Sequence, residues 1–153
     1  MATQISRERL IALLNEDLAR EYQAIIAYVV YSQVLKGPEY MSIAKELETH
    51  AGQELDHALR LSKHIDYLGG TPAIAPKPVK APGDAKQMLR ADLDNENETV
   101  RNYRERVRQC EALSEYAIAE DIREILREEQ EHQIDLATAL GENVPVMSEP
   151  VHE

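Results

Sequence analysis

One pattern of charged residues occurs twice in this chain and restricts its fold more than any other feature. A glutamate is followed 33 residues later by a second glutamate, and a histidine lies three positions beyond that. The two copies are offset by 75 residues and consist of Glu21, Glu54 and His57 in the first and Glu96, Glu129 and His132 in the second. Residues three positions apart share one face of an α-helix, so each Glu-x-x-His pair predicts a helix that presents both side chains together.

Each of these six residues lies on a stripe of apolar residues with the three- and four-residue spacing of a helix. Four such stripes follow one another, and residues that cap or break helices separate them. We expect the helices to begin after Ser6, at Pro38, after Asp84 and after Ser114. We expect them to end before Gly37, before Gly69, at the seam of residues 112–114 and before Gly141.

The connection between the second and third predicted helices is rich in helix-breaking residues. Residues 69–83 contain four prolines and three glycines, which favours an extended chain. At about 3.1 Å per residue this segment reaches about 45 Å, which is the length of a helix of about 30 residues. The sequence therefore predicts an all-α protein. Its domain is a four-helix bundle of two antiparallel pairs over residues 1–141, followed by a flexible tail at residues 142–153.

The composition disfavours several classes of function. The chain has 17 Lys and Arg against 28 Asp and Glu, and the resulting net charge of −11 disfavours binding to nucleic acid or to an anionic membrane. Cys110 is the single cysteine, which excludes an intramolecular disulfide and is typical of a reducing compartment. The first ten residues lack an apolar signal segment and no apolar run is long enough to span a bilayer, so we expect a cytoplasmic protein.

The six repeated residues call for a counter-charge if the helices bring them together. Each lies near the middle of its helix, so all six should meet at one level of the bundle. Four buried carboxylates are costly to desolvate and repel one another, whereas two divalent metal ions would balance their charge. Carboxylates with one imidazole for each ion suit iron or manganese. The pattern therefore predicts a di-metal carboxylate site.

The repeats and the segment EILREEQEH at residues 124–132 resemble the ferritin-like superfamily, and most closely bacterioferritin, over residues 8–141. The resemblance implies a ferritin-like fold and a site of two iron ions. It also implies that Glu54 and Glu129 are shared between those ions. The same six residues would be the catalytic site of a ferroxidase, which oxidises Fe(II) to Fe(III) with dioxygen or hydrogen peroxide for iron storage or detoxification. They are Glu21, Glu54, His57, Glu96, Glu129 and His132.

The sequence also departs from bacterioferritin. Leu55 stands where that family has its haem-binding methionine, so we expect no haem. The tail contains Pro145 and Pro150 and should not form the fifth helix of a 24-subunit shell. We nevertheless expect a homo-oligomer built from twofold dimers, because apolar residues lie off the first stripe and would form an exposed patch. These residues are Tyr22, Ile26, Val29, Val30 and Tyr31.

Two other functions fit the same pattern. Tyr28 and Tyr103 each follow a glutamate of the repeat by seven residues. This pair of tyrosines resembles rubrerythrin and keeps a peroxide reductase, or another di-metal oxidoreductase without storage, as the alternative function. A non-catalytic bundle that buffers metal or mediates assembly is the third hypothesis. Tyr28 itself would either pack in the core or donate a hydrogen bond to a ligand on another helix.

Three further residues could bind metal or react, but we expect structural roles for them. His50 and His64 lie seven residues on either side of His57 on the same stripe. We expect them to be hydrogen-bonded interior or bundle-end histidines rather than a metal relay. Cys110 lies on the third stripe near a helix end and is expected to be a small core residue.

Overall fold

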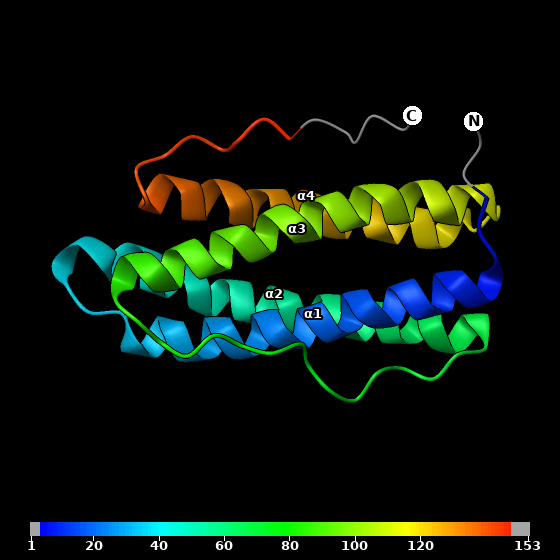
Figure 1. The fold of residues 1–153 in the computed structure, drawn as a ribbon, viewed down its shortest axis with the longest axis horizontal. Coiled ribbons are helices and arrows are strands. Elements are labelled where there is room, and N and C mark those ends of the chain that lie inside the picture. Colours follow the sequence, from blue (N-terminus) through cyan, green and yellow to red (C-terminus); the bar gives the residue numbers. More distant parts are fainter. Residues whose placement is uncertain (1–3, 148–153) are drawn as a thin grey trace.

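The computed structural model describes residues 4–147, and four long helices make up most of them (Figure 1). The helices are α1 (Arg7–Val34), α2 (Met41–Leu68), α3 (Ala85–Ala112) and α4 (Tyr116–Ala139), and a short 3-10 helix, η1 (Pro38–Tyr40), leads into α2. Helix α1 packs against α2 and α3 packs against α4, each pair antiparallel. The described residues contain no strand, so the prediction of an all-α bundle is confirmed.

Side chains cap two of the helices as the sequence predicts. The Ser6 hydroxyl accepts a hydrogen bond from the backbone N–H of Arg9 at 3.0 Å. At the start of α3, Asp84 accepts from the backbone N–H of Gln87 at 2.8 Å, and the Gln87 side chain accepts from the N–H of Asp84 at 2.9 Å. This reciprocal pair satisfies two backbone donors that a helix start otherwise leaves free.

The prediction that Ser114 caps the fourth helix is wrong. Ser114 has a φ of 60°, and its N–H bonds to the carbonyl of Glu111 while the N–H of Glu115 bonds to that of Cys110. These two bonds form the motif that commonly closes a helix, with its left-handed residue just past the helix end. Ser114 therefore ends α3, and α4 begins at Tyr116 without a side-chain cap.

The crossover from α2 to α3 runs alongside α1 (Figure 1). It makes hydrogen bonds with successive turns of that helix: Asn15 Nδ2 to Thr71 O at 3.0 Å, Lys77 N to Ala19 O at 3.0 Å, Gln23 Nε2 to Pro78 O at 2.7 Å, and Tyr31 Oη to Lys80 O at 2.5 Å. Tyr31 is consequently only 2% exposed, and its predicted place in an exposed patch is wrong. Ile26 and Val29 do remain exposed, while Tyr22 and Val30 are half-buried.

The apolar core consists of two clusters at different levels of the bundle. One lies where α1 begins and includes Leu14, Leu61 and Ile122. The other lies where α1 ends and includes Leu47, Leu89 and Leu136. The glutamates and histidines of the repeat belong to neither cluster, because they occupy the level between them. The fold thus places a polar layer between two apolar ones.

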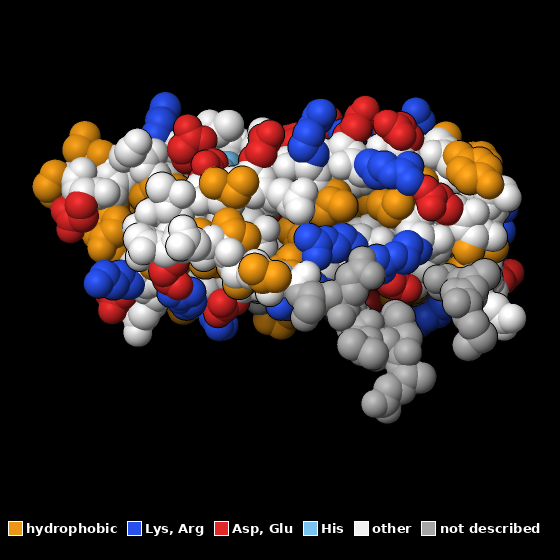
Figure 2. Space-filling view, turned by 90° about the horizontal axis from the view of Figure 1, so that it is seen from above, with side chains coloured by type: hydrophobic (Ala, Val, Ile, Leu, Met, Phe, Trp, Pro, Cys, Tyr) orange, Lys and Arg blue, Asp and Glu red, His pale blue; other side chains and the backbone are white. Residues whose placement is uncertain are grey.

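The outer surface carries charges of both signs. Figure 2 views the molecule from the side on which α3 and α4 lie, and there acidic, basic and hydrophobic side chains are interspersed over the face. None of the described helices combines the length and the apolar character needed to cross a membrane. Beyond α4, residues 142–147 contain no helix, and the rest of the predicted tail, including Pro150, lies outside the described residues.

Candidate metal centre

The structure brings all six residues of the sequence repeat together in the polar layer. Each helix contributes at the same level, and every one of the six side chains is at most 3% exposed. The contributions are Glu21 from α1, Glu54 and His57 from α2, Glu96 from α3, and Glu129 and His132 from α4. The convergence predicted from the mid-helix positions is therefore present in the fold.

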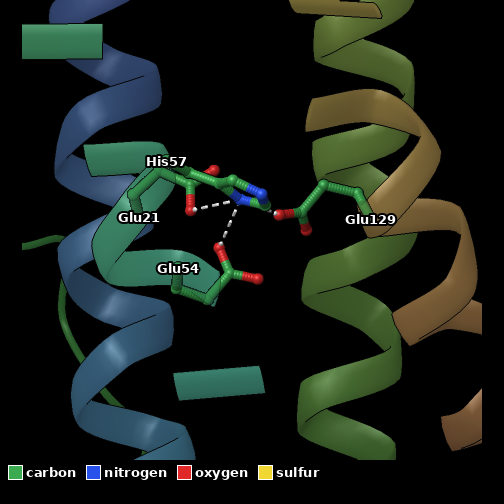
Figure 3. A group of neighbouring side chains, drawn as sticks. All are labelled: Glu21, Glu54, His57 and Glu129. Carbon is green, nitrogen blue, oxygen red and sulfur yellow. Dashed lines mark hydrogen bonds and ion pairs between the residues drawn. The ribbon is translucent and has the colours of Figure 1, made fainter. Parts of the chain in front are cut away.

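Three carboxylates surround His57 (Figure 3). Its Nδ1 atom lies 2.7 Å from Glu129 Oε1, 3.3 Å from Glu54 Oε2 and 3.6 Å from Glu21 Oε2. Ligand atoms of these four residues all lie within 4.8 Å of one another. This is a compact set of one nitrogen and three carboxylates.

His132 has a matching environment. Its Nδ1 atom lies 2.9 Å from Glu54 Oε1, 3.6 Å from Glu96 Oε1 and 3.8 Å from Glu129 Oε2. Glu54 and Glu129 therefore face both histidines, each with a different oxygen toward each ring. This division of oxygens would allow both carboxylates to contact two metal ions.

Several buried polar atoms of the centre lack a hydrogen-bond partner. They are Glu21 Oε2, Glu54 Oε1, Glu96 Oε2, Glu129 Oε1, His57 Nε2 and His132 Nδ1. Buried polar atoms are rarely left unpaired in a native fold. Glu54 Oε1 and His132 Nδ1 are close together but not in hydrogen-bond geometry, so both atoms are free for a cation between them. The donor set fits divalent metal ions.

Two tyrosines bind the two glutamates that each face a single histidine, Glu21 beside His57 and Glu96 beside His132. The Tyr28 hydroxyl donates to Glu96 Oε1, and the Tyr103 hydroxyl donates to Glu21 Oε1. In both pairs the donor and acceptor come from different helices, as one of the two hypotheses for Tyr28 predicts. Burial, together with the nearby carboxylates, raises the pKa of both tyrosines well above 10.0, so both stay protonated donors at neutral pH.

The outer nitrogens of the two histidines face different groups. His132 Nε2 lies 2.6 Å from Gln53 Oε1, and His57 Nε2 lies 3.6 Å from Glu128 Oε2. Sequence analysis missed both partners. Each directly precedes a glutamate of the repeat, so the 75-residue offset relates them and could have identified them. Such groups orient a ligand imidazole and tune its basicity.

The same offset relates two buried aspartates that the sequence patterns did not reveal. Asp17 accepts two hydrogen bonds from Arg106, at 2.6 Å and 3.0 Å. Its counterpart Asp92 is 2% exposed, and its Oδ2 has no partner. Burial and the nearby Glu96 raise the pKa of Asp92 well above 3.8. The two halves of the centre thus differ just outside the six residues, because Asp17 has an arginine partner and Asp92 Oδ2 has no partner.

The three remaining candidates lie outside the six-residue centre, and each has contacts of its own. His50 Nε2 lies 3.2 Å from Asp135 Oδ2, and His64 Nε2 lies 2.6 Å from Asp121 Oδ2. Cys110 is fully buried in the apolar cluster at the start of α1. Burial raises the pKa of its thiol to about 12, so it is a neutral core residue at physiological pH.

Without metal, protons neutralise the centre. Burial and the neighbouring carboxylates raise the pKa of Glu54 and of Glu129 well above 4.5. Burial alone would raise the pKa of Glu96, but its contacts with Glu129, His132 and the Tyr28 hydroxyl outweigh burial and lower this pKa to about 2. For His57 and His132 burial lowers the pKa, yet the surrounding carboxylates outweigh it and raise the pKa above 6.5.

Comparisons with known proteins agree with this geometry. The profile of the ferritin-like domain family, Ferritin, matches residues 11–143. The chain is 28% identical to a bacterioferritin of Brucella melitensis over 141 residues, which are 88% of each chain. It is 30% identical to a bacterial ferritin of Paramagnetospirillum magnetotacticum over 138 residues, 88% of this chain and 84% of that protein.

Two solved structures have the same fold. One is described as a ferritin-like, diiron-carboxylate protein from Bacillus anthracis, with a TM-score of 0.85 and 32% identity, over 90% of this chain and 99% of that one. The other is a dodecameric thioferritin from Bacteroides fragilis, described as a bacterioferritin-related protein. It has a TM-score of 0.82 and 26% identity, over 90% of this chain and 87% of that one.

We predict that metal stabilises the fold more strongly as pH rises. Because the pKa values of Glu54, Glu129, His57 and His132 are raised, the metal-free folded state binds more protons than the unfolded chain. Its stability therefore falls as pH rises above about 4.5 for the glutamates and above about 6.5 for the histidines. The low pKa of Glu96 has the opposite effect on stability. It stabilises the folded state above about pH 4.5, and this stabilisation is lost only as pH falls from about 4.5 toward about 2.

Metal must displace these protons, so the Tm difference between Mn(II)-loaded and metal-free protein should widen from about pH 5.5 to about pH 8. Calorimetry of Mn(II) binding in buffers of different ionisation enthalpy should show proton release. Binding heats that do not depend on the buffer would contradict the assignment of protons to the centre.

Proposed function

The chain belongs to the ferritin-like domain family, and from this we propose that it binds two iron ions at the six-residue centre and oxidises Fe(II) to Fe(III) there for iron storage or detoxification. One observation carries the proposal: two buried histidines share two carboxylates, and unpartnered atoms surround them. The relatives named bacterioferritin and the structural neighbour described as a diiron-carboxylate protein support it.

The contacts suggest how the residues would divide between two ions. Glu21 and His57 would hold one ion, and Glu96 and His132 would hold the other. Glu54 and Glu129 would contact both ions, since each directs one oxygen toward each histidine. Four carboxylates balance two divalent charges, which makes the loaded layer neutral. Manganese suits the same ligands and is the alternative metal.

The surrounding residues would keep the reaction confined. Tyr28 and Tyr103 fix one oxygen each of Glu96 and Glu21, which leaves the second oxygen free for an ion. The apolar clusters above and below the layer keep water out along the bundle axis. Iron bound there would supply the electrons that dioxygen or hydrogen peroxide takes up. Leu55, on the outer face of α2, offers no sulfur ligand for haem.

We predict that Glu54→Ala and Glu129→Ala each slow Fe(II) oxidation by about 100-fold or more. Each substitution removes a carboxylate that would supply one ligand oxygen to each of the two ions. Stopped-flow absorbance during anaerobic Fe(II) loading and oxygen mixing measures the rate. The matched control is Glu131→Ala, an exposed neighbour that should oxidise Fe(II) at the normal rate. Circular dichroism should show intact helices in all three variants. Near-normal oxidation in either ligand variant would remove that glutamate from the site.

The fate of the oxidised iron separates storage from the rubrerythrin-like alternative. Storage requires that many ferric ions stay with each chain after repeated additions of Fe(II). A peroxide reductase would instead retain two ions per chain and consume peroxide continuously when a reductant is supplied. Iron analysis after gel filtration, paired with a peroxide-consumption assay, distinguishes the two.

We further propose a homo-oligomer built from twofold dimers that pair α1 and α2. Ile26 and Val29 on α1 are 40% and 51% exposed, and Leu55 and Leu59 on α2 are 53% and 64% exposed. Large exposed apolar side chains of this kind commonly mark an interface. The Bacteroides fragilis neighbour is described as dodecameric, which supports an assembly.

We predict that light scattering gives at least a dimer for the native chain. Val29→Glu combined with Leu59→Glu should shift the mass toward the monomer, because both charges would be buried in the interface. Ile134→Glu on α4 is the control, since Ile134 is 54% exposed on the other helix pair. A monomeric native chain, or dissociation by the control alone, would refute this interface.

A further inference from the structure

We propose that Glu46, His50 and Asp135 form a third metal site that binds one divalent cation at the bundle surface. Glu46 and His50 lie one helical turn apart on α2, and Asp135 faces them from α4. One ligand atom from each residue lies within 4.8 Å of the other two. None of the three belongs to the six-residue centre, so this site goes beyond the proposed function and does not depend on Fe(II) oxidation.

The buried imidazole distinguishes this cluster from ordinary surface acids. His50 is 1% exposed, whereas Glu46 is exposed and the Asp135 side chain is 42% exposed. His50 Nε2 faces Asp135 Oδ2 at 3.2 Å, and the other ring nitrogen is buried with no hydrogen-bond partner. The hydrogen bonding of the ring is thus incomplete, although buried imidazoles normally have their partners.

Neighbouring rings hold His50 in place. Its ring stacks on His132 with centroids 3.9 Å apart and an interplanar angle of 24°. The Tyr28 ring meets it edge-on at 5.1 Å. The ring is therefore ordered before any ion arrives, which reduces the entropy lost on binding. Because His132 belongs to the six-residue centre, the stacked His50 ring places the proposed site directly beside that centre.

A cation can reach the cluster from solvent. A surface pocket of about 230 Å³ is lined by Glu46 and Asp135, together with Ser42 and Thr138. These lining residues come from the start of α2 and the end of α4, and these two ends lie at the same end of the bundle (Figure 1). One imidazole and two carboxylates suit Fe(II), Mn(II), Co(II) or Zn(II), and water from the open pocket would complete the coordination.

The other histidine–aspartate contact between α2 and α4 provides an internal comparison. His64 faces Asp121 at 2.6 Å, but there Arg60 also binds Asp121 at 2.6 Å. A guanidinium thus already balances that carboxylate. Among residues 4–147, by contrast, no lysine or arginine forms an ion pair with Glu46 or Asp135. The cluster around His50 therefore has two acids and no protein cation.

Cobalt binding to the metal-free full chain tests the proposal. Equilibrium dialysis under anaerobic conditions should give three Co(II) per chain for the native protein and two for the variant Glu46→Gln with Asp135→Asn. Both substitutions are on exposed or half-exposed side chains and keep the side-chain shape, so the fold should persist. The matched control Asp121→Asn should still bind three. A third ion that persists in the double variant, or native protein that binds only two ions, would overturn the proposal.

A second variant separates this site from the six-residue centre. Glu54→Gln with Glu129→Gln should leave one Co(II) per chain, and anomalous diffraction should place it between Glu46 and Asp135. If the centre did not bind metal but the proposed site did, the native chain would bind one ion and the Glu46→Gln, Asp135→Asn variant none. Failure of the third site would instead leave the native chain and that double variant with equal cobalt.

Discussion

The burial of four carboxylates in one layer of an apolar bundle is the constraint on which the rest of the structure depends. Such a layer must be neutralised, because unpaired charges in a low-dielectric interior cost several kcal/mol each. Protons on Glu54, Glu129 and the two histidines do this in the metal-free chain, and two divalent ions would do it in the loaded one. Metal binding would therefore exchange the positive charge of these protons for that of two metal ions.

The internal repeat explains how a single chain builds this layer. Residues 75 positions apart have equivalent roles. Tyr28 of the first copy binds Glu96 of the second, and Tyr103 of the second copy binds Glu21 of the first. The equivalence is incomplete in the surrounding shell. Arg106 neutralises Asp17, whereas Tyr31 occupies the matching position near Asp92. The two ion positions would therefore differ in electrostatic surroundings although their direct ligands match.

Much of the fold follows from the sequence, because apolar stripes and caps such as Ser6 and Asp84 act locally. The level at which the six residues meet also follows, since a residue near the middle of each helix stays near the middle of the bundle whichever way the helix runs. Ser114 could not be placed in this way, because its left-handed backbone depends on how α3 ends. The burial of Tyr31 depends on where the crossover packs, which no local pattern encodes. The role of the six residues as metal ligands stays a prediction.

Anomalous diffraction at the iron edge, from crystals loaded with Fe(II) without oxygen, tests the central claim most directly. The account predicts two iron peaks in the polar layer of every chain, one beside His57 and one beside His132. Both peaks should contact Glu54 and Glu129. Iron found only elsewhere on the chain, or a single ion held without those two glutamates, would contradict the account.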